Sequence, residues 1–315
     1  MAETQKYIVN GYAYPSISQQ TLQWWLPRLT WISAFSYGFT GEGQLINLKD
    51  YNLTSPANSA GVRPLMVLTP MDGEGRFSDA AAISVFNDGT AKQNLIDNIE
   101  SNIKKKNLGG VDFDFEYIPG EYAESYVQLV SDTAMRLRPQ GYLTTVALAP
   151  KVSRDQPGLL YAGHDYAGMG RAADYCLLMT YEWGYTYGPP MAVSPVNNVR
   201  RVVEYGLTEI PASKILLGMS NYGYDWKLPF VKGESKAEKL TNYQAGGRAE
   251  YYGVEPEYDE EAQSPFYRYY DPAGAEHIVW YENEQSWRSR LALVEEYGLA
   301  GVSIWNIMSE FYGGL

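Results

Sequence analysis

The amino-acid sequence predicts an α/β protein, a (β/α)₈ TIM barrel with a small α+β insertion between the seventh strand and the last helix. Eight short apolar segments are separated mostly by helical patterns, and this alternation implies parallel strands that close into a barrel. The segments are apolar on both faces, as strands covered on both sides are. The length of 315 residues also fits, because such barrels typically need about 250 residues.

The expected elements alternate along most of the chain. The eight strands are predicted at 6–13, 32–37, 64–70, 110–116, 142–149, 174–180, 214–220 and 300–307. The helices between them are predicted at 16–29, 78–85, 91–107, 121–138, 165–171, 195–206 and 285–297. Pro195 stands at the start of one helix and Gly298 follows the end of another, as is typical of helix termini.

One interval breaks this alternation, from residue 224 to 284. Its segments PFYRYYD and EHIVWYE flank Pro272-Ala273-Gly274 and predict a β-hairpin. Such a long connection in a compact protein is usually functional. We therefore expect a catalytic barrel made of 1–223 and 285–315, with 224–284 as an insertion that forms one wall of a cleft. The alternative is a decoration of the surface.

The stretch GGVDFDFEY, residues 109–117, carries the chemistry. Asp112, Asp114 and Glu116 are two residues apart, so in a strand they share one face. An exposed acidic strand is disfavoured, because like charges two apart on one face repel each other. The carboxylates are instead expected to point into the barrel, with Glu116 nearest the carboxyl end, where such barrels keep their active sites.

Composition excludes several functions. A net charge of −12 and a pI near 4.7 argue against nucleic-acid binding, which needs clustered Lys and Arg. Cys176 lies alone in an apolar run and is expected to be buried and free of a disulfide. His164 and His277 are expected to lie at the surface or in hydrogen bonds, and they do not make a convincing zinc ligand set. No metal and no cofactor is predicted.

The first residues lack the basic and apolar regions of a signal peptide, and no apolar run approaches 18 residues. No membrane span is therefore expected. Lys151 follows the fifth predicted strand and raises the alternative of a Schiff-base aldolase. We disfavour that alternative, because Lys151 lies beyond a proline with no apolar pocket evident around it.

VDFDFEY resembles the catalytic strand of the family 18 glycoside hydrolases, whose pattern is D-x-x-D-x-D-x-E. Gly109 stands where that pattern has its first Asp. The resemblance extends over about residues 7 to 307 and includes the ends of several other strands. The matching positions are Gly11-Tyr12, Met179-Thr180-Tyr181-Glu182 (M-T-Y-D in the family), Asn221 to Trp226 and Trp305. It implies a retaining glycosidase that uses the acetamido group of its own substrate.

Within that family, ALAPK, MTYEWGYTYGPP and NYGYDW are most similar to bacterial spore-cortex and cell-wall N-acetylglucosaminidases. This branch implies a carbohydrate substrate, peptidoglycan or spore cortex, cleaved after N-acetylglucosamine. It also implies action outside the cell, on the cell wall or on the spore surface. The protein is expected to be a monomer. Two alternatives remain open: a chitinase acting on N-acetylglucosamine polymers, and a carbohydrate-binding barrel without catalysis.

The resemblance also implies residue roles. Glu116 would be the general acid, Asp114 would orient the acetamido group, and Asp112 would share a proton with Asp114. Tyr181 would hold the acetamido oxygen, Trp305 would stack under the sugar ring, and Glu182 would bind a sugar hydroxyl. The substrate-binding set is completed by Asn221 and by Tyr12, Tyr222 and Trp226, and for these three aromatic residues core packing is an equal alternative. Non-proline cis peptides are implied at 34–35, 116–117 and 305–306.

Overall fold

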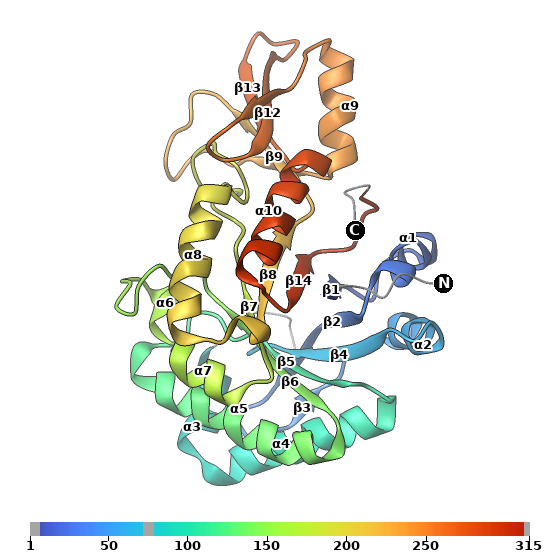
Figure 1. The fold of residues 1–315 in the computed structure, drawn as a ribbon, viewed down its shortest axis with the longest axis vertical. Helices are drawn as coiled ribbons and strands as arrows, with labels where there is room; N and C mark the ends of the chain where they lie inside the picture. The colour runs from blue at the N-terminus through green and yellow to red at the C-terminus, as the bar shows by residue number, and fades with distance from the viewer. Residues whose placement is uncertain (1–6, 72–78, 312–315) are drawn as a thin grey trace.

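The computed structural model describes residues 7–71 and 79–311, and within them the expected barrel is confirmed. Eight parallel strands close in the order β1, β2, β4, β5, β6, β7, β8 and β14, with β14 pairing back to β1 (Figure 1). Their bounds are Ile8–Ala13, Trp31–Phe39, Arg63–Leu68, Gly110–Phe113, Leu143–Leu148, Tyr175–Leu178, Ile215–Ser220 and Gly301–Trp305. The short β3, Leu45–Ile46, pairs antiparallel with β2. The predicted positions Lys6 and Ser78 lie outside the described residues.

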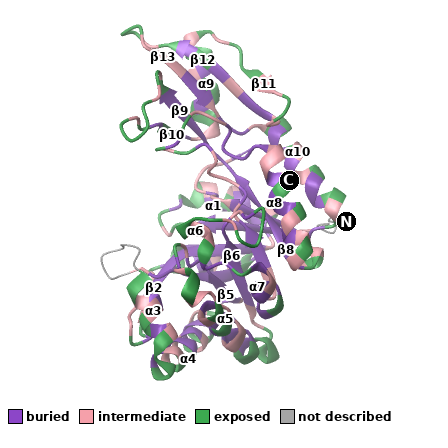
Figure 2. Cartoon of the chain, turned by 90° about the vertical axis from the view of Figure 1, so that its left-hand side faces the viewer, coloured by how far each residue is buried: buried purple, intermediate pink, exposed green. Residues whose placement is uncertain are grey.

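Helices surround the barrel and turn their exposed faces outward (Figure 2). Helices α1 to α5 are Gln19–Trp25, Tyr51–Ser59, Asp79–Asn87, Gly89–Lys106 and Ala123–Leu137. Helices α6 to α10 are Leu159–Ala162, Tyr166–Ala172, Val196–Glu209, Asn242–Tyr252 and Glu284–Tyr297. Short 3₁₀ turns lie at Leu26–Arg28, Gly120–Tyr122, Arg138–Gln140 and Ala212–Lys214. No helix in the described part of the chain is both long and apolar enough to span a bilayer.

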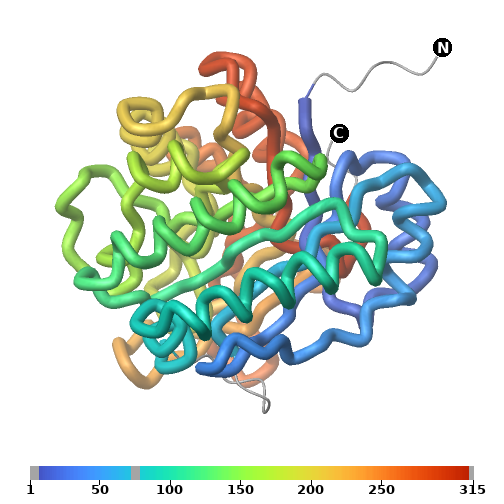
Figure 3. Tube along the Cα trace, turned by 90° about the horizontal axis from the view of Figure 1, so that it is seen from below, coloured from blue at the N-terminus to red at the C-terminus, as the bar shows by residue number. Residues whose placement is uncertain are grey.

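Local sequence explains where the long helices begin and end. Asp88 caps α4 by accepting hydrogen bonds from two backbone N–H groups, and Asn107 ends the helix in the left-handed region. A capping box at Asn283 starts α10, and Gly298 ends it with a φ of 62°. Helices α4 and α5 run side by side (Figure 3), joined by an ion pair between Arg136 and Glu100.

A second, antiparallel sheet follows β8, with strand order β10-β9-β13-β12-β11. Strands β9 to β13 are Gly223–Lys227, Glu238–Leu240, Glu257–Asp259, Ser264–Tyr270 and Glu276–Trp280. The predicted hairpin is present as β12 and β13, which pair from Phe266 opposite Trp280 to Tyr270 opposite Glu276. The sheet and α9 lie together at one end of the molecule (Figure 1).

A buried ion pair ties this sheet to the barrel. Arg290 of α10 donates hydrogen bonds to Ser264 at the start of β12 and to the carbonyl of Ser194, which precedes α8. Its guanidinium lies 3.8 Å from the Glu282 carboxylate, and both side chains are 1% exposed. Removing one member of such a pair would leave an uncompensated buried charge. The sheet is therefore anchored by groups that the fold fully desolvates.

The implied cis peptides are only partly right. The bond between Trp305 and Asn306 is cis as expected, but the bond near β2 is Phe35–Ser36, one residue later than expected. The pairing of β2 with β4 shifts register in this place, between Ala34 and Tyr37. Leu228–Pro229 is also cis, whereas the bond after Glu116 is not among the cis bonds of the described residues. Tyr117 instead turns the chain with a φ of 58°.

Candidate active site

A cavity of about 370 Å³ opens at the carboxyl ends of the barrel strands. Asp114 and Glu116 reach it from the segment after β5, Tyr181 and Glu182 from the segment after β7, and Trp305 from the end of β14. The other lining residues are Tyr14, Phe35, Pro150, Leu160, Tyr161, Met179 and Trp183. Five of the residues predicted to act on substrate thus lie around one space, although they come from three parts of the sequence.

The acidic segment differs from its prediction in one respect, because β5 ends at Phe113 and not at Glu116. The alternation nevertheless continues past the end of the strand. Phe113 and Phe115 are fully buried in the main hydrophobic core, and Phe115 stacks on Tyr126 of α5 with ring centroids 5.0 Å apart. This packing holds the two phenylalanines outside the barrel, so Asp114 and Glu116 turn toward the cavity.

Asp112 lies beneath the cavity and is 2% exposed. Its carboxylate accepts a hydrogen bond of 2.5 Å from the Tyr12 hydroxyl and another of 2.5 Å from the Thr145 hydroxyl. Burial raises the pKa of Asp112 to about 6, although both hydrogen bonds act in the opposite direction. This carboxyl therefore exchanges its proton near neutral pH.

Asp114 and Glu116 both hold their protons more tightly than ordinary carboxyls. Burial raises the pKa of Asp114 well above its usual value, and the charges of Glu116 and Asp112 raise it further. Burial also raises the pKa of Glu116, with a further contribution from Glu182. Oδ1 of Asp114 is buried and has no hydrogen-bond partner among the described residues. The site thus brings two carboxyls with raised pKa values to the cavity, and one oxygen of Asp114 has no partner among the described residues.

Glu182 is held at the edge of the cavity by two tyrosines. Its Oε1 accepts hydrogen bonds from the hydroxyls of Tyr222 and Tyr224, at 2.5 and 2.9 Å. Its backbone adopts a φ of 63°, a left-handed conformation that costs energy for a residue with a side chain. Nζ of Lys239 also lies nearby, 3.9 Å from the same Oε1. Tyr222, predicted to bind substrate, thus positions Glu182.

Trp305 forms an aromatic wall of the cavity. Edge-to-face contacts with Tyr12 and Phe35, at centroid distances of 5.6 and 4.9 Å, fix its orientation. Tyr12 is itself buried, so its contacts are with Asp112 and Trp305. Tyr181 is half-buried and faces the same space. An aromatic face above a cluster of carboxylates suits a sugar ring that carries polar substituents at its edge.

Two other predicted substrate-binding residues lie apart from this cavity. Asn221 is buried, and its amide donates to the backbone carbonyls of Asn306 and Ser309. Trp226 is 1% exposed and donates its indole N–H to the Gly188 carbonyl. Packing and backbone hydrogen bonds occupy both side chains. The cavity also includes Tyr14, Phe35 and Trp183, which sequence reasoning did not single out, although Trp183 directly follows the quoted Glu182.

Lys151 and His164 support the acidic segment from behind. His164 is buried, with one ring nitrogen 2.9 Å from the carbonyl of Phe115 and the other accepting from the backbone of Ala149. Burial lowers the pKa of His164 to about 4, so the ring is neutral near pH 7. Nζ of Lys151 donates to the His164 carbonyl and takes no part in lining the cavity. These contacts give no support to the aldolase alternative.

Cys176 and His277 do not line the cavity. Cys176 is buried and free, as predicted. His277 approaches the buried carboxylate of Asp225 in the second sheet, with Nδ1 at 2.8 Å. Residues 7–71 and 79–311 contain no group of three His, Cys, Asp or Glu side chains that could hold a metal ion.

The fold and this site define a class: a (β/α)₈ barrel with coupled carboxylates and an aromatic wall at its carboxyl end, as in enzymes that act on sugars. The sequence profile described as "Glycosyl hydrolases family 18" matches residues 36–310. The chain belongs to this family.

Curated and solved relatives agree. The chain is 38% identical over 285 residues to a protein named cortical fragment-lytic enzyme from Bacillus subtilis, a match that covers 90% of this chain and 66% of the relative. The crystal structure of the Bacillus megaterium spore cortex-lytic enzyme SleL matches with a TM-score of 0.92 at 35% identity, over 99% of this chain and 73% of that one.

A third comparison concerns the fold alone. A chitinase structure from Chromobacterium violaceum matches with a TM-score of 0.88 at 24% identity, over 96% of this chain and 95% of that one. The chain spans about two thirds of the length of the curated cortical fragment-lytic enzymes it matches.

Proposed function

We propose that this protein is a retaining glycoside hydrolase that cleaves β-1,4 bonds after N-acetylglucosamine in peptidoglycan or spore cortex. The observation that carries the proposal is the geometry of Asp114. Its Oδ1 is buried and has no hydrogen-bond partner among the described residues, and Glu116, two residues further on, lines the same cavity with a raised pKa. A buried acceptor without a donor is costly, so a substrate N–H that fills it would bind favourably.

Glu116 is proposed as the general acid. Glycosidic cleavage needs a group that stays protonated near neutral pH and gives its proton to the leaving oxygen. Burial and the nearby charge of Glu182 raise the pKa of Glu116, and its carboxyl lines the cavity where that oxygen would lie. After the leaving group departs, the same carboxylate would accept a proton from the incoming water.

Asp114 and Tyr181 are proposed to control the acetamido group of the substrate. Asp114 would accept a hydrogen bond from the acetamido N–H, and the Tyr181 hydroxyl would hold the acetamido oxygen. That oxygen would attack the anomeric carbon as the bond to the leaving oxygen breaks, forming an oxazolinium-like intermediate. Water would then open this ring at the same carbon. Two displacements at the anomeric carbon retain its configuration, and no covalent bond to the protein forms.

A proton shared by the buried carboxyls of Asp112 and Asp114 would move during the catalytic cycle. Asp112 accepts from Tyr12 and Thr145, and its pKa lies near 6. We propose that Asp112 and Asp114 titrate together and that a shared proton shifts as positive charge develops on the acetamido group. Trp305 would stack beneath the sugar, and Glu182 would accept a hydrogen bond from a sugar hydroxyl.

The names of the relatives support the substrate and the place of action. Two of them are a cortical fragment-lytic enzyme and a spore cortex-lytic enzyme, which match 90% and 99% of this chain. We propose that this protein also acts on spore cortex or cell-wall glycan, outside the cell, and that it does so as a monomer.

The test is a digest of purified cortex and of vegetative peptidoglycan beside chitooligosaccharides, with products identified by mass spectrometry. The proposal expects fragments that end in reducing N-acetylglucosamine from peptidoglycan, and none from the Glu116→Gln protein. Cleavage of chitooligosaccharides alone would make the protein a chitinase. Binding of glycan without any cleavage would make it a carbohydrate-binding barrel.

A further inference from the structure

Lys239 is a cation at the edge of the acidic cavity. It lies in β10, where the pairing of β10 with β9 places it opposite Tyr224. Its Nζ lies 3.6 Å from the centroid of the Tyr222 ring and 5.8 Å from that of Tyr224. The Glu182 carboxylate, which lines the cavity, is 3.9 Å away. Two aromatic faces and strand pairing therefore set the position of this charge.

The hydrogen-bonding capacity of Lys239 is not used by its neighbours. Nζ carries three donors, and none of the hydrogen bonds within residues 7–71 and 79–311 starts from it. Glu182 does not accept a hydrogen bond from Lys239. Its Oε1 already accepts from Tyr222 and Tyr224, and the distance from Oε1 to Nζ is too long for a hydrogen bond. The side chain of Lys239 is 44% exposed. A ligand can therefore reach the ammonium group.

The charge of Lys239 is unusual in these surroundings. Three carboxyl groups line the cavity, those of Asp114, Glu116 and Glu182, and none of the described lining residues is Lys, Arg or His. Even where Asp114 and Glu116 hold their protons, the cavity lining offers no positive charge to an anionic substrate. An anionic substituent on the substrate would be stabilised only beside a cation, and Lys239 is placed to provide one.

We propose that Lys239 selects substrates whose sugar next to the cleaved bond carries an anionic substituent. In peptidoglycan that substituent is the lactyl ether with its attached peptide, which ends in free carboxylates; chitin has no such group. This inference rests on the proposed glycosidase activity and adds the basis of its substrate choice. It also gives the second sheet a role, because β10 supplies a specificity-determining residue from outside the barrel.

The test uses one substrate in two charge states. A soluble peptidoglycan tetrasaccharide that carries its stem peptides is compared with the same compound after its peptide carboxylates are amidated. The sugars, the acetamido groups and the cleaved bond are identical, so the ratio of the two kcat/KM values measures recognition of charge. A chitotetraose of neutral sugars is the third substrate.

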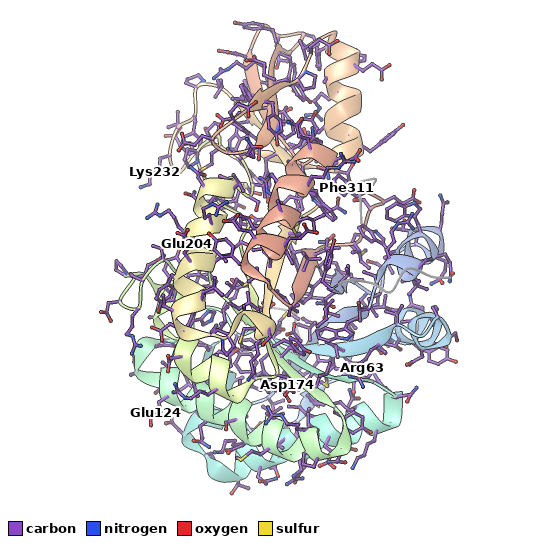
Figure 4. The ribbon with its side chains drawn as sticks, viewed as in Figure 1. Arg63, Glu124, Asp174, Glu204, Lys232 and Phe311 are labelled. Atoms are coloured by element: carbon purple, nitrogen blue, oxygen red, sulfur yellow. The ribbon has the colours of Figure 1, made fainter. Side chains whose placement is uncertain are left out.

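Four proteins are compared. Lys239→Met keeps most of the side-chain length without the charge, and Lys239→Arg restores the charge. Lys232→Met removes an exposed lysine of the same connection, seven residues earlier, and serves as the matched control (Figure 4). The wild-type protein is expected to favour the anionic tetrasaccharide by about fivefold, a modest factor because Lys239 is partly exposed to solvent.

In Lys239→Met that preference should vanish through a higher KM for the anionic substrate, while kcat/KM for the amidated substrate and for chitotetraose is unchanged. Lys239→Arg should keep the preference, and Lys232→Met should behave as wild type. An equal loss on all three substrates would show that Lys239 only supports Glu182, and an unchanged ratio would show that it plays no part in recognition. Either result overturns the inference, whereas cleavage of no substrate by the wild-type protein would instead overturn the proposed function.

Discussion

The hydroxyl of Tyr12, at the end of β1, hydrogen-bonds the carboxylate of Asp112 in β5 across the interior of the barrel, at 2.5 Å. With the bond from Thr145 to the other oxygen, both oxygens of Asp112 have partners. Oδ1 of Asp114, two residues further on, has none among the described residues. The barrel thus completes the hydrogen bonds of one acid and leaves one oxygen of the other, which lines the cavity, without a partner among the described residues.

Asp114→Asn should therefore lower kcat by at least about a hundredfold, a loss typical of a missing stabiliser of transition-state charge. An asparagine cannot provide the negative charge that offsets the cationic intermediate. KM should change much less, because the loss falls mainly on the transition state. Steady-state kinetics on a chitooligosaccharide measure both constants. Asp97→Asn, an exposed substitution on α4, is the control and should leave both unchanged.

Activity should fall as pH rises through the raised pKa of Glu116, because the acid must be protonated to act. Glu182→Gln removes one of the two causes of that raised pKa. The alkaline limb of the kcat/KM profile should then move to lower pH. A pH-rate series on both proteins checks this. An alkaline limb that stays in place, or moves to higher pH, would contradict the proposed effect of the Glu182 charge on the pKa of Glu116.

His164 should make the fold sensitive to acid. Its pKa is about 4 in the folded protein and near 6.5 when unfolded, so the unfolded chain takes up the proton first. Stability from this group is complete above pH 6.5 and declines toward pH 4, by up to about 3 kcal/mol. Urea unfolding at several pH values should show a shallower decline in His164→Gln. Parallel curves for the two proteins would refute this role, whatever their offset.

Gly109, where the family pattern has its first Asp, directly precedes β5 and does not line the cavity. A Cβ there would lie 2.0 Å from Cγ of Arg63, an exposed side chain at the start of β4 that would have to change its rotamer (Figure 4). At the neighbouring Gly110 a Cβ would lie 2.2 Å from the backbone oxygen of Leu143. Gly109→Ala should cost about 1–2 kcal/mol, because Arg63 must change its rotamer, and Gly110→Ala about 3 kcal/mol or more, because the clash is with backbone. Thermal unfolding of the two variants measures both losses of stability. Equal losses would contradict the conclusion that Gly109 tolerates a side chain better than Gly110 does.

Much of the fold could be predicted because its signals are local and repeat. The apolar segments and the turn at Pro272-Ala273-Gly274 each indicate structure within a few residues. Helix α2, Tyr51–Ser59, was not predicted, since Pro56 lies inside it and the stretch TSPANS is typical of a turn. The carboxyl end of β5 was also misplaced, because alternation of side chains continues beyond the last strand pairing at Phe113.

The site was predictable to the extent that it follows strand ends. Glu116, Asp114, Tyr181, Glu182 and Trp305 all line the cavity, whereas Asn221 and Trp226 lie apart from it and make packing and backbone contacts. Nothing in a single sequence separates an aromatic residue that faces a cavity from one that faces a neighbouring sheet. Lys239 could not be predicted either, because its position depends on pairing between β9 and β10.

The most direct test of the central claim is the stereochemistry of the first product. Proton NMR of a chitooligosaccharide digest, recorded before the anomers equilibrate, shows which form is released. Two displacements, first by the acetamido oxygen and then by water, predict that the β anomer appears first, and that Glu116→Gln releases neither form. Initial release of the α anomer would mean a single displacement by water and would contradict the mechanism proposed for Asp114 and Glu116.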